Sequence, residues 1–96
     1  MKYAAIIEYL RDPEKVEALR PTHRQYLADL KQRGQLVAAG TFTDGTGALI
    51  IYEAGSATEA EQLLQGDPFH KGGIFLPWVL RPWNPVIANR DHFPAS

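Results

Sequence analysis

Residues 36–54 read LVAAGTFTDGTGALIIYEA, and this stretch decides the fold. Two runs that suit β-strands, Leu36–Thr43 and Thr46–Ala54, flank the dipeptide Asp44-Gly45. An Asp-Gly pair between two such runs is typical of a tight β-hairpin, because both residues tolerate the backbone angles that the turn requires. The stretch therefore predicts two adjacent antiparallel strands in the middle of the chain.

On the N-terminal side of this hairpin, the sequence predicts a strand and then helical structure. Tyr3–Leu10 is short and largely apolar, and a turn signal follows it at 11–13. From Pro13 to Arg33, apolar residues recur every three or four positions, as they do on one face of a helix. Because a proline inside a helix removes a hydrogen bond, we expect a short helical turn at Glu14–Leu19 and a second helix that starts at Pro21.

On the C-terminal side, the sequence predicts another helix and a last strand. Ser56-Ala57-Thr58-Glu59 is a capping box that opens a helix, and Gly66 is expected to close it. Ile74–Leu80 is rich in apolar residues and is predicted to be the fourth strand. Pro77 within it cannot donate to a β-ladder, so this strand is expected at an edge of the sheet.

The resulting order, β-α-β-β-α-β, is the ferredoxin-like or split βαβ pattern. It predicts an α+β fold with an antiparallel sheet of strand order 4-1-3-2 and helices on one face only. The 96 residues are predicted to form a single domain, with its core at residues 1–83 and a C-terminal tail at 84–96.

The predicted strands look apolar on both faces. Segments 4–7, 48–52 and 74–76 do not alternate between apolar and polar residues, as the strands of a sheet with one wet face would. The helices cover one face, and the second face needs another cover. We therefore expect a homodimer in which two sheets pack face to face; the alternative is that the tail folds back over this face.

The composition excludes several classes of function. The net charge of −1 lacks the basic footprint of a nucleic-acid-binding protein. Because the chain has no cysteine, disulfides, thiolate catalysis and cysteine-based zinc sites are excluded. The apolar start of the chain is interrupted at Glu8 and is too short for a signal peptide or a membrane span. We expect a cytoplasmic protein that binds neither nucleic acid nor membrane.

The predicted topology brings His23 and Asp67 to the same end of the domain, together with Arg20 and Asp44. His23 lies on the apolar stripe of its helix, so its ring is expected to point toward the sheet and to need a hydrogen-bond partner. Asp67 is the candidate, since a carboxylate would fix the tautomer and favour the imidazolium. His23 and Asp67 are thus candidate catalytic residues; a purely structural pair, with Asp67 capping a turn before Pro68, is the alternative.

Other residues are candidates for binding a substrate. Arg20 would hold a carboxylate through two hydrogen bonds, or would instead pair with Glu17 or Glu14 at the surface. The expected helix start at Pro21 would also offer free N–H groups to an anion. The aromatic candidates for a pocket wall also suit a plain core, and they are Tyr9, Phe69, Trp78 and Trp83.

No metal or cofactor site is predicted. The chain has 3 histidines, His23, His70 and His92, and their spacing matches no metal-ligand motif. The Gly-rich turn at 44–47 lacks the Lys-Ser/Thr ending and the following helix of a phosphate-binding loop.

Several of these residues together resemble the YCII (YciI-like) family, from Tyr3 to about Trp83. The resemblance is carried by the following motifs: Arg20-x-x-His23 followed by Tyr26-Leu27, Gly34-x-Leu36-x-x-x-Gly40, Asp44-Gly45 and Asp67-Pro68-Phe69. It implies a dimeric α/β barrel of ferredoxin-like subunits, in which His23 and Asp67 match the pair proposed as a catalytic dyad. A relative in this family dechlorinates a muconate-type acid, while most members have no assigned reaction.

Two functions fit these observations. The first is a cofactor-independent enzyme that binds a small organic acid, with His23 as general acid and base, Asp67 as its orienting partner and Arg20 on the anion; isomerase, lyase or dehalogenase chemistry would fit. The second is a non-catalytic dimeric module that binds a small ligand or serves a structural role. An enzyme requires His23 to contact Asp67 and also to face a pocket.

Overall fold

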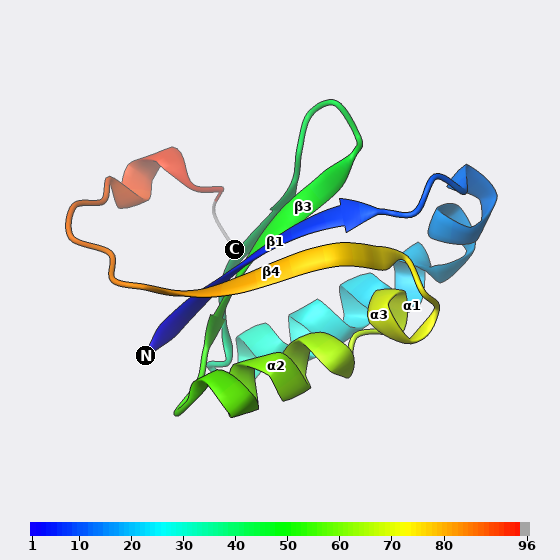
Figure 1. Cartoon of the computed structure of the whole chain (residues 1–96). Coiled ribbons are helices and arrows are strands. Elements are labelled where there is room, and N and C mark those ends of the chain that lie inside the picture. Colours follow the sequence, from blue (N-terminus) through cyan, green and yellow to red (C-terminus); the bar gives the residue numbers. More distant parts are fainter. Residues whose placement is uncertain (95–96) are drawn as a thin grey trace.

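A four-stranded antiparallel sheet carries the long helices on one of its faces (Figure 1). The structure, a computed structural model, describes residues 1–94. The elements follow one another as β1 (Lys2–Tyr9), α1 (Pro13–Gln32), β2 (Leu36–Thr41), β3 (Gly47–Glu53), α2 (Ala57–Gln65), α3 (Pro68–Lys71), β4 (Phe75–Trp83) and η1 (Arg90–His92). The strand order β2-β3-β1-β4 is the predicted ferredoxin-like order read from the other edge, so the predicted fold class is confirmed.

The helix starts follow from side-chain caps. Asp12 accepts a hydrogen bond from the N–H of Lys15 and precedes Pro13, which suits the first position of α1. At the start of α2, Ser56 accepts from the N–H of Glu59, as the capping box predicts. The Glu59 carboxylate bonds back to the N–H of Gly55, one residue earlier than expected.

The predicted break of the first helix at Pro21 is wrong. α1 runs without interruption from Pro13 to Gln32, with Pro21 inside it. Its buried residues, Val16, His23 and Leu30, lie seven apart, so one stripe packs on the sheet before and after the proline. This packing outweighs the hydrogen bond that the Glu17 carbonyl loses. No helix starts at Pro21, and the free N–H groups expected there for an anion do not exist.

A one-turn helix, α3, follows Asp67 and was not predicted. Asp67 is its N-cap and accepts from the N–H of Phe69. After α3, β4 extends to Trp83 and pairs only with β1, so the edge position expected from Pro77 is confirmed. In Figure 1 the chain after β4 leaves on the side of the sheet that faces away from the helices.

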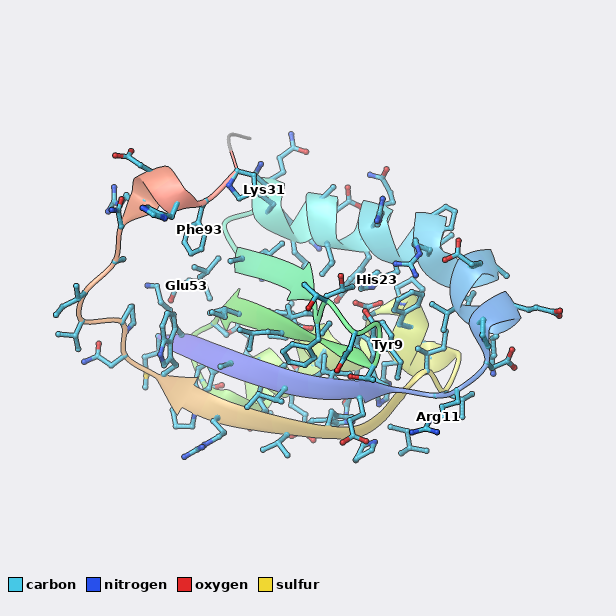
Figure 2. All side chains as sticks on the ribbon, turned by 90° about the horizontal axis from the view of Figure 1, so that it is seen from above. Tyr9, Arg11, His23, Lys31, Glu53 and Phe93 are labelled. Carbon is cyan, nitrogen blue, oxygen red and sulfur yellow. The ribbon has the colours of Figure 1, made fainter. Side chains whose placement is uncertain are left out.

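The two faces of the sheet differ in their cover. On the helix side, Ile7 of β1 and Ile50 of β3 are fully buried with residues of all three α-helices, namely Leu30, Leu64 and Phe69. On the other side, Ile6 pairs with Leu49 and Val79 in register, and the three side chains are 45, 38 and 54% exposed. Figure 2 looks toward this open face. Within residues 1–94, no helix is long and apolar enough to cross a membrane.

Replacing Pro21 by alanine is expected to stabilise the protein. The change restores an N–H donor for the Glu17 carbonyl and removes a steric cost of about 3 kcal/mol, while the unfolded chain regains entropy worth about 1 kcal/mol. We expect the free energy of unfolding in urea to rise by about 2 kcal/mol. The control Gln25→Ala, at an exposed position of the same helix, should change it by less than about 0.5 kcal/mol. A Pro21→Ala protein no more stable than the parent would contradict this account of α1.

Candidate active site

The predicted contact between His23 and Asp67 is present. Nδ1 of His23 lies 2.8 Å from Oδ1 and 2.9 Å from Oδ2 of Asp67. Oδ1 also accepts the N–H of Phe69 at 2.9 Å. Asp67 is fully buried, and only 8% of the His23 side chain is exposed. Because a carboxylate only accepts hydrogen bonds, the neutral imidazole carries its proton on Nδ1 and its lone pair on Nε2.

Aromatic rings hold the imidazole in place. The Phe69 ring stacks on the His23 ring with centroids 3.9 Å apart and planes at 6°. Phe75 meets the His23 ring edge-on, with centroids 6.1 Å apart. Phe69 is fully buried, so its expected direct contact with a substrate is not supported. The Phe69 ring instead supports one face of the imidazole and fixes its plane.

His23 lines a small hollow between α1 and the sheet, which we call the inner hollow and which has a volume of about 300 Å³. From α1 it is lined by Arg20, His23, Arg24 and Leu27. From the sheet it is lined by Tyr9, Ala39, Gly40, Thr41, Ala48 and Ile50. Nε2 of His23 forms no hydrogen bond within the described part of the chain, so its lone pair is left for the contents of this hollow.

A second hollow, of about 620 Å³, adjoins the first and is called the outer hollow. Both hollows are lined by Tyr9, Arg20 and Thr41, so they are neighbours, and we call the two together the cleft. The outer hollow reaches the β1–α1 connection and the β2–β3 turn. Figure 2 shows His23 and Tyr9 toward the end of the sheet where β1 leads into α1, with Glu53 at the opposite end.

Tyr9 lies in the cleft, as expected of a pocket aromatic. Its ring stacks with Phe75 and meets Phe69 edge-on. Burial raises the pKa of the Tyr9 hydroxyl, Arg20 and Arg24 act to lower it, and Asp67 acts to raise it. The hydroxyl is protonated at neutral pH and can donate a hydrogen bond to a ligand.

Arg20 lies in the cleft and is also paired at the surface. Its Nε donates to Oε1 of Glu17 at 3.0 Å, which is the alternative pairing that the sequence left open. Arg24, one turn later, also lines the inner hollow and was missed from the sequence. Its spacing of four residues from Arg20 places both on one face of α1, and this spacing was the signal available.

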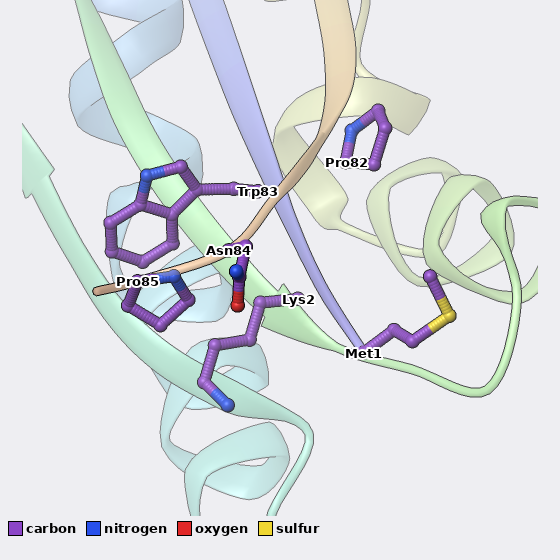
Figure 3. Close-up of a pocket in the computed structure, with 6 residues that line it drawn as sticks. All are labelled: Met1, Lys2, Pro82, Trp83, Asn84 and Pro85. Atoms are coloured by element: carbon purple, nitrogen blue, oxygen red, sulfur yellow. The ribbon is translucent and has the colours of Figure 1, made fainter.

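The remaining aromatic and histidine candidates lie elsewhere. Trp83 lines a separate hollow of about 340 Å³ with Met1, Lys2, Pro82, Asn84 and Pro85, where β1 begins and β4 ends (Figure 3). Trp78 packs against the main core and meets the His70 ring edge-on. His92 is exposed in η1. Among residues 1–94, no group of three or more His, Cys, Asp or Glu side chains is placed to hold a metal ion.

The fold and the site define a ferredoxin-like α+β protein with a buried histidine–aspartate pair at the wall of a cleft. The YCII-related domain matches residues 1–84, and the chain belongs to that family. No curated protein sequence matches the chain.

Two solved structures show a similar fold. One is 5-chloro-2-hydroxyhydroquinone dehydrochlorinase (TftG) from Burkholderia phenoliruptrix AC1100, in complex with 2,5-dihydroxybenzoquinone; it is 23% identical, with a TM-score of 0.77, over 88% of this chain and 94% of that one. The other is Rv0793 from Mycobacterium tuberculosis, which is 14% identical, with a TM-score of 0.54, over 92% of this chain and 98% of that one.

Truncating Asp67 is expected to destabilise the protein and to change the tautomer of the His23 ring. Asp67→Ala leaves the Phe69 N–H and the His23 Nδ1–H buried without their acceptor, so the free energy of unfolding should fall by about 2–4 kcal/mol. In ¹⁵N spectra of the neutral ring, the proton should no longer reside mainly on Nδ1.

The matched control is Asp29→Ala, the same truncation at an exposed position of α1, where we expect a change below about 0.5 kcal/mol. Equal losses in the two variants, or an unchanged His23 tautomer in Asp67→Ala, would contradict the role assigned to the contact.

Proposed function

We propose that this protein is a cofactor-independent enzyme that moves a proton on a small organic acid bound in the cleft. One observation carries the proposal: Nδ1 of His23 is held by Asp67, while the same ring lines a cleft. A histidine oriented on one nitrogen and available on the other is suited to general acid–base catalysis. In this proposal His23 and Asp67 form a catalytic pair. His23 touches the substrate, and Asp67 orients the His23 ring.

The proposed chemistry uses the lone pair on Nε2. It takes a proton from a carbon next to a carbonyl or carboxyl group, and the buried Asp67 carboxylate stabilises the imidazolium that forms. Returning the proton to another atom gives an isomerisation, and loss of a leaving group gives an elimination. Arg20 and Tyr9 line the same cleft, and in this proposal their guanidinium and hydroxyl groups stabilise the anionic intermediate.

One structure of similar fold supports the proposal of this class of reaction. The YCII-related family match places the chain among relatives of the same fold. The dehydrochlorinase that shares the fold is described with a dihydroxybenzoquinone, and removing hydrogen chloride from an organic molecule requires proton abstraction. At 23% identity the likeness does not transfer a substrate.

A second candidate is a non-catalytic module that binds a small ligand. The observation in its favour is the low exposure of His23, whose side chain is 8% exposed. A histidine sealed in the core would support this candidate. His23 lines the inner hollow, so the catalytic proposal is favoured.

The test is exchange of carbon-bound hydrogen for deuterium in a set of small carboxylic acids, followed by proton NMR in D₂O. We expect the parent protein to catalyse exchange of at least one acid and His23→Gln to slow it by about 100-fold or more, the usual scale of general acid–base catalysis. The control His92→Gln, an exposed histidine outside the cleft, should exchange at the parental rate. Binding of an acid without exchange would favour the non-catalytic module, and exchange that survives in His23→Gln would contradict the role assigned to His23.

We also propose that two copies pair through their open sheet faces to form a homodimer. Ile6, Leu49 and Val79 form a continuous apolar row across three strands, and each remains more than a third exposed. The described part of the tail reaches one end of this row without burying it: Phe93 and Pro94 share a hollow with Leu49, which stays 38% exposed. Val86 and Ile87 of the tail are themselves exposed. The same face of a second copy would bury the row symmetrically.

Charging the centre of this row is expected to dissociate the dimer. Ile6→Asp would place an unpaired carboxylate in an apolar interface, so the mass measured by light scattering should fall from that of two chains to that of one. Ile87→Asp, a matched change in the exposed tail, should leave the mass unchanged. This proposal would be contradicted if the parent protein had the mass of a single chain, or if Ile6→Asp kept the mass of two chains.

A further inference from the structure

The charges of the cleft are divided between its two hollows. The outer hollow is lined by the acidic residues Glu8, Asp12 and Glu17 and by the basic residues Arg11 and Arg20. The inner hollow has no acidic residue in its lining, and its basic residues are Arg20 and Arg24, with His23 between them. An anionic group is therefore favoured in the inner hollow and opposed by carboxylates in the outer one.

The two arginines differ in whether their side chains are already in an ion pair. Arg20 is already bound through Nε to Glu17. For Arg24, the structure of residues 1–94 shows no ion pair. Arg24 thus supplies the positive charge of the inner hollow that is not in an ion pair among the described residues, while the Asp67 carboxylate is bonded to His23 and to the Phe69 N–H. Arg24 and Tyr9 both line this hollow, and Arg24 acts to lower the pKa of the Tyr9 hydroxyl.

The helix places Arg24 on the same face as His23, where it can bind an anion beside the imidazole. Arg20, His23, Arg24 and Leu27 fall at positions i, i+3, i+4 and i+7, so they share one face of α1. An anion held between the two guanidinium groups lies next to His23 on the same helical turns. Leu27 continues this face with an apolar side chain, and Ala48 and Ile50 form an apolar floor on the sheet.

We propose that Arg24 is the residue that selects the substrate of this cleft, and that the substrate is a small monoanionic acid with an otherwise neutral, apolar body. Its one carboxylate binds at Arg24 in the inner hollow, which places the carbon next to the carboxylate against His23. The remainder of the molecule extends toward the outer hollow, where Glu8, Asp12 and Glu17 disfavour a second anionic group. This inference rests on the proposed function, because it specifies the substrate class for the same cleft.

Benzoate and its neutral analogue benzamide are suitable probes, since they share a flat apolar ring and differ in the carboxylate. Binding is measured by NMR titration, following the ring signals of His23. We expect the dissociation constant of benzoate to rise at least tenfold in Arg24→Met and to recover in part in Arg24→Lys, while that of benzamide changes less than twofold. Arg33→Met, which removes the same charge from the exposed end of α1, should change benzoate binding less than twofold.

Terephthalate tests the preference for a single charge. Its second carboxylate lies opposite the first and would enter the outer hollow, so we expect it to bind no more tightly than benzoate. Binding at least tenfold tighter than that of benzoate would overturn the assignment of a monoanionic substrate.

Ala39→Leu separates a failure of this inference from a failure of the proposed function. Ala39 is exposed and lies in register with the buried Ile50, so a larger side chain there narrows the inner hollow without entering the core. We expect it to weaken benzoate and benzamide alike. If Ala39→Leu does so but Arg24→Met and Arg33→Met behave identically, Arg24 is not the selecting residue and the cleft remains the binding site. If neither probe perturbs His23 in the parent protein, both this inference and the proposed function fail.

Discussion

The fully buried carboxylate of Asp67 requires hydrogen-bond donors from two separate parts of the chain. A buried charge is costly unless hydrogen bonds compensate it. Here His23 from α1 and the Phe69 N–H at the start of α3 supply those bonds. The pair therefore joins the long helix to the α2–α3 junction, and the same bonds leave the far nitrogen of the imidazole for a ligand. The His23–Asp67 pair is thus both a structural link between helices and a candidate catalytic group.

The cleft beside this pair follows from the way α1 lies on the sheet. One stripe of the helix is buried, and the neighbouring stripe carries Arg20, Arg24 and Leu27 along the opening. The opposite wall is built from small residues of β2, Ala39, Gly40 and Thr41, which leave space that larger side chains would fill. The positive charges collect beside His23 because helical spacing, and not sequence adjacency, decides which side chains face the same space.

Much of the fold was predictable because local signals agreed with one another. The Asp44-Gly45 turn, the Ser56 cap and the edge proline Pro77 each act over a few residues, and the hairpin, the helix start and the edge strand that they predict are present. Pro21 did not follow its local preference. The packing of Val16 and Leu30 on the sheet is a property of the whole domain, and it keeps the helix continuous through a residue that would end an isolated one.

The order of the four strands and the end of the domain at which His23 and Asp67 meet could be predicted from the sequence, because hydrophobic periodicity and turn chemistry are properties of neighbouring residues. The continuity of α1 through Pro21 and the short helix α3 could not. Only the tertiary structure decided what surrounds that pair. Phe69 proved to be a fully buried support for the imidazole, Arg20 was already paired with Glu17, and Arg24 entered the cleft. These outcomes depend on distances between segments far apart in the chain, and such distances exist only once the helices have packed on the sheet.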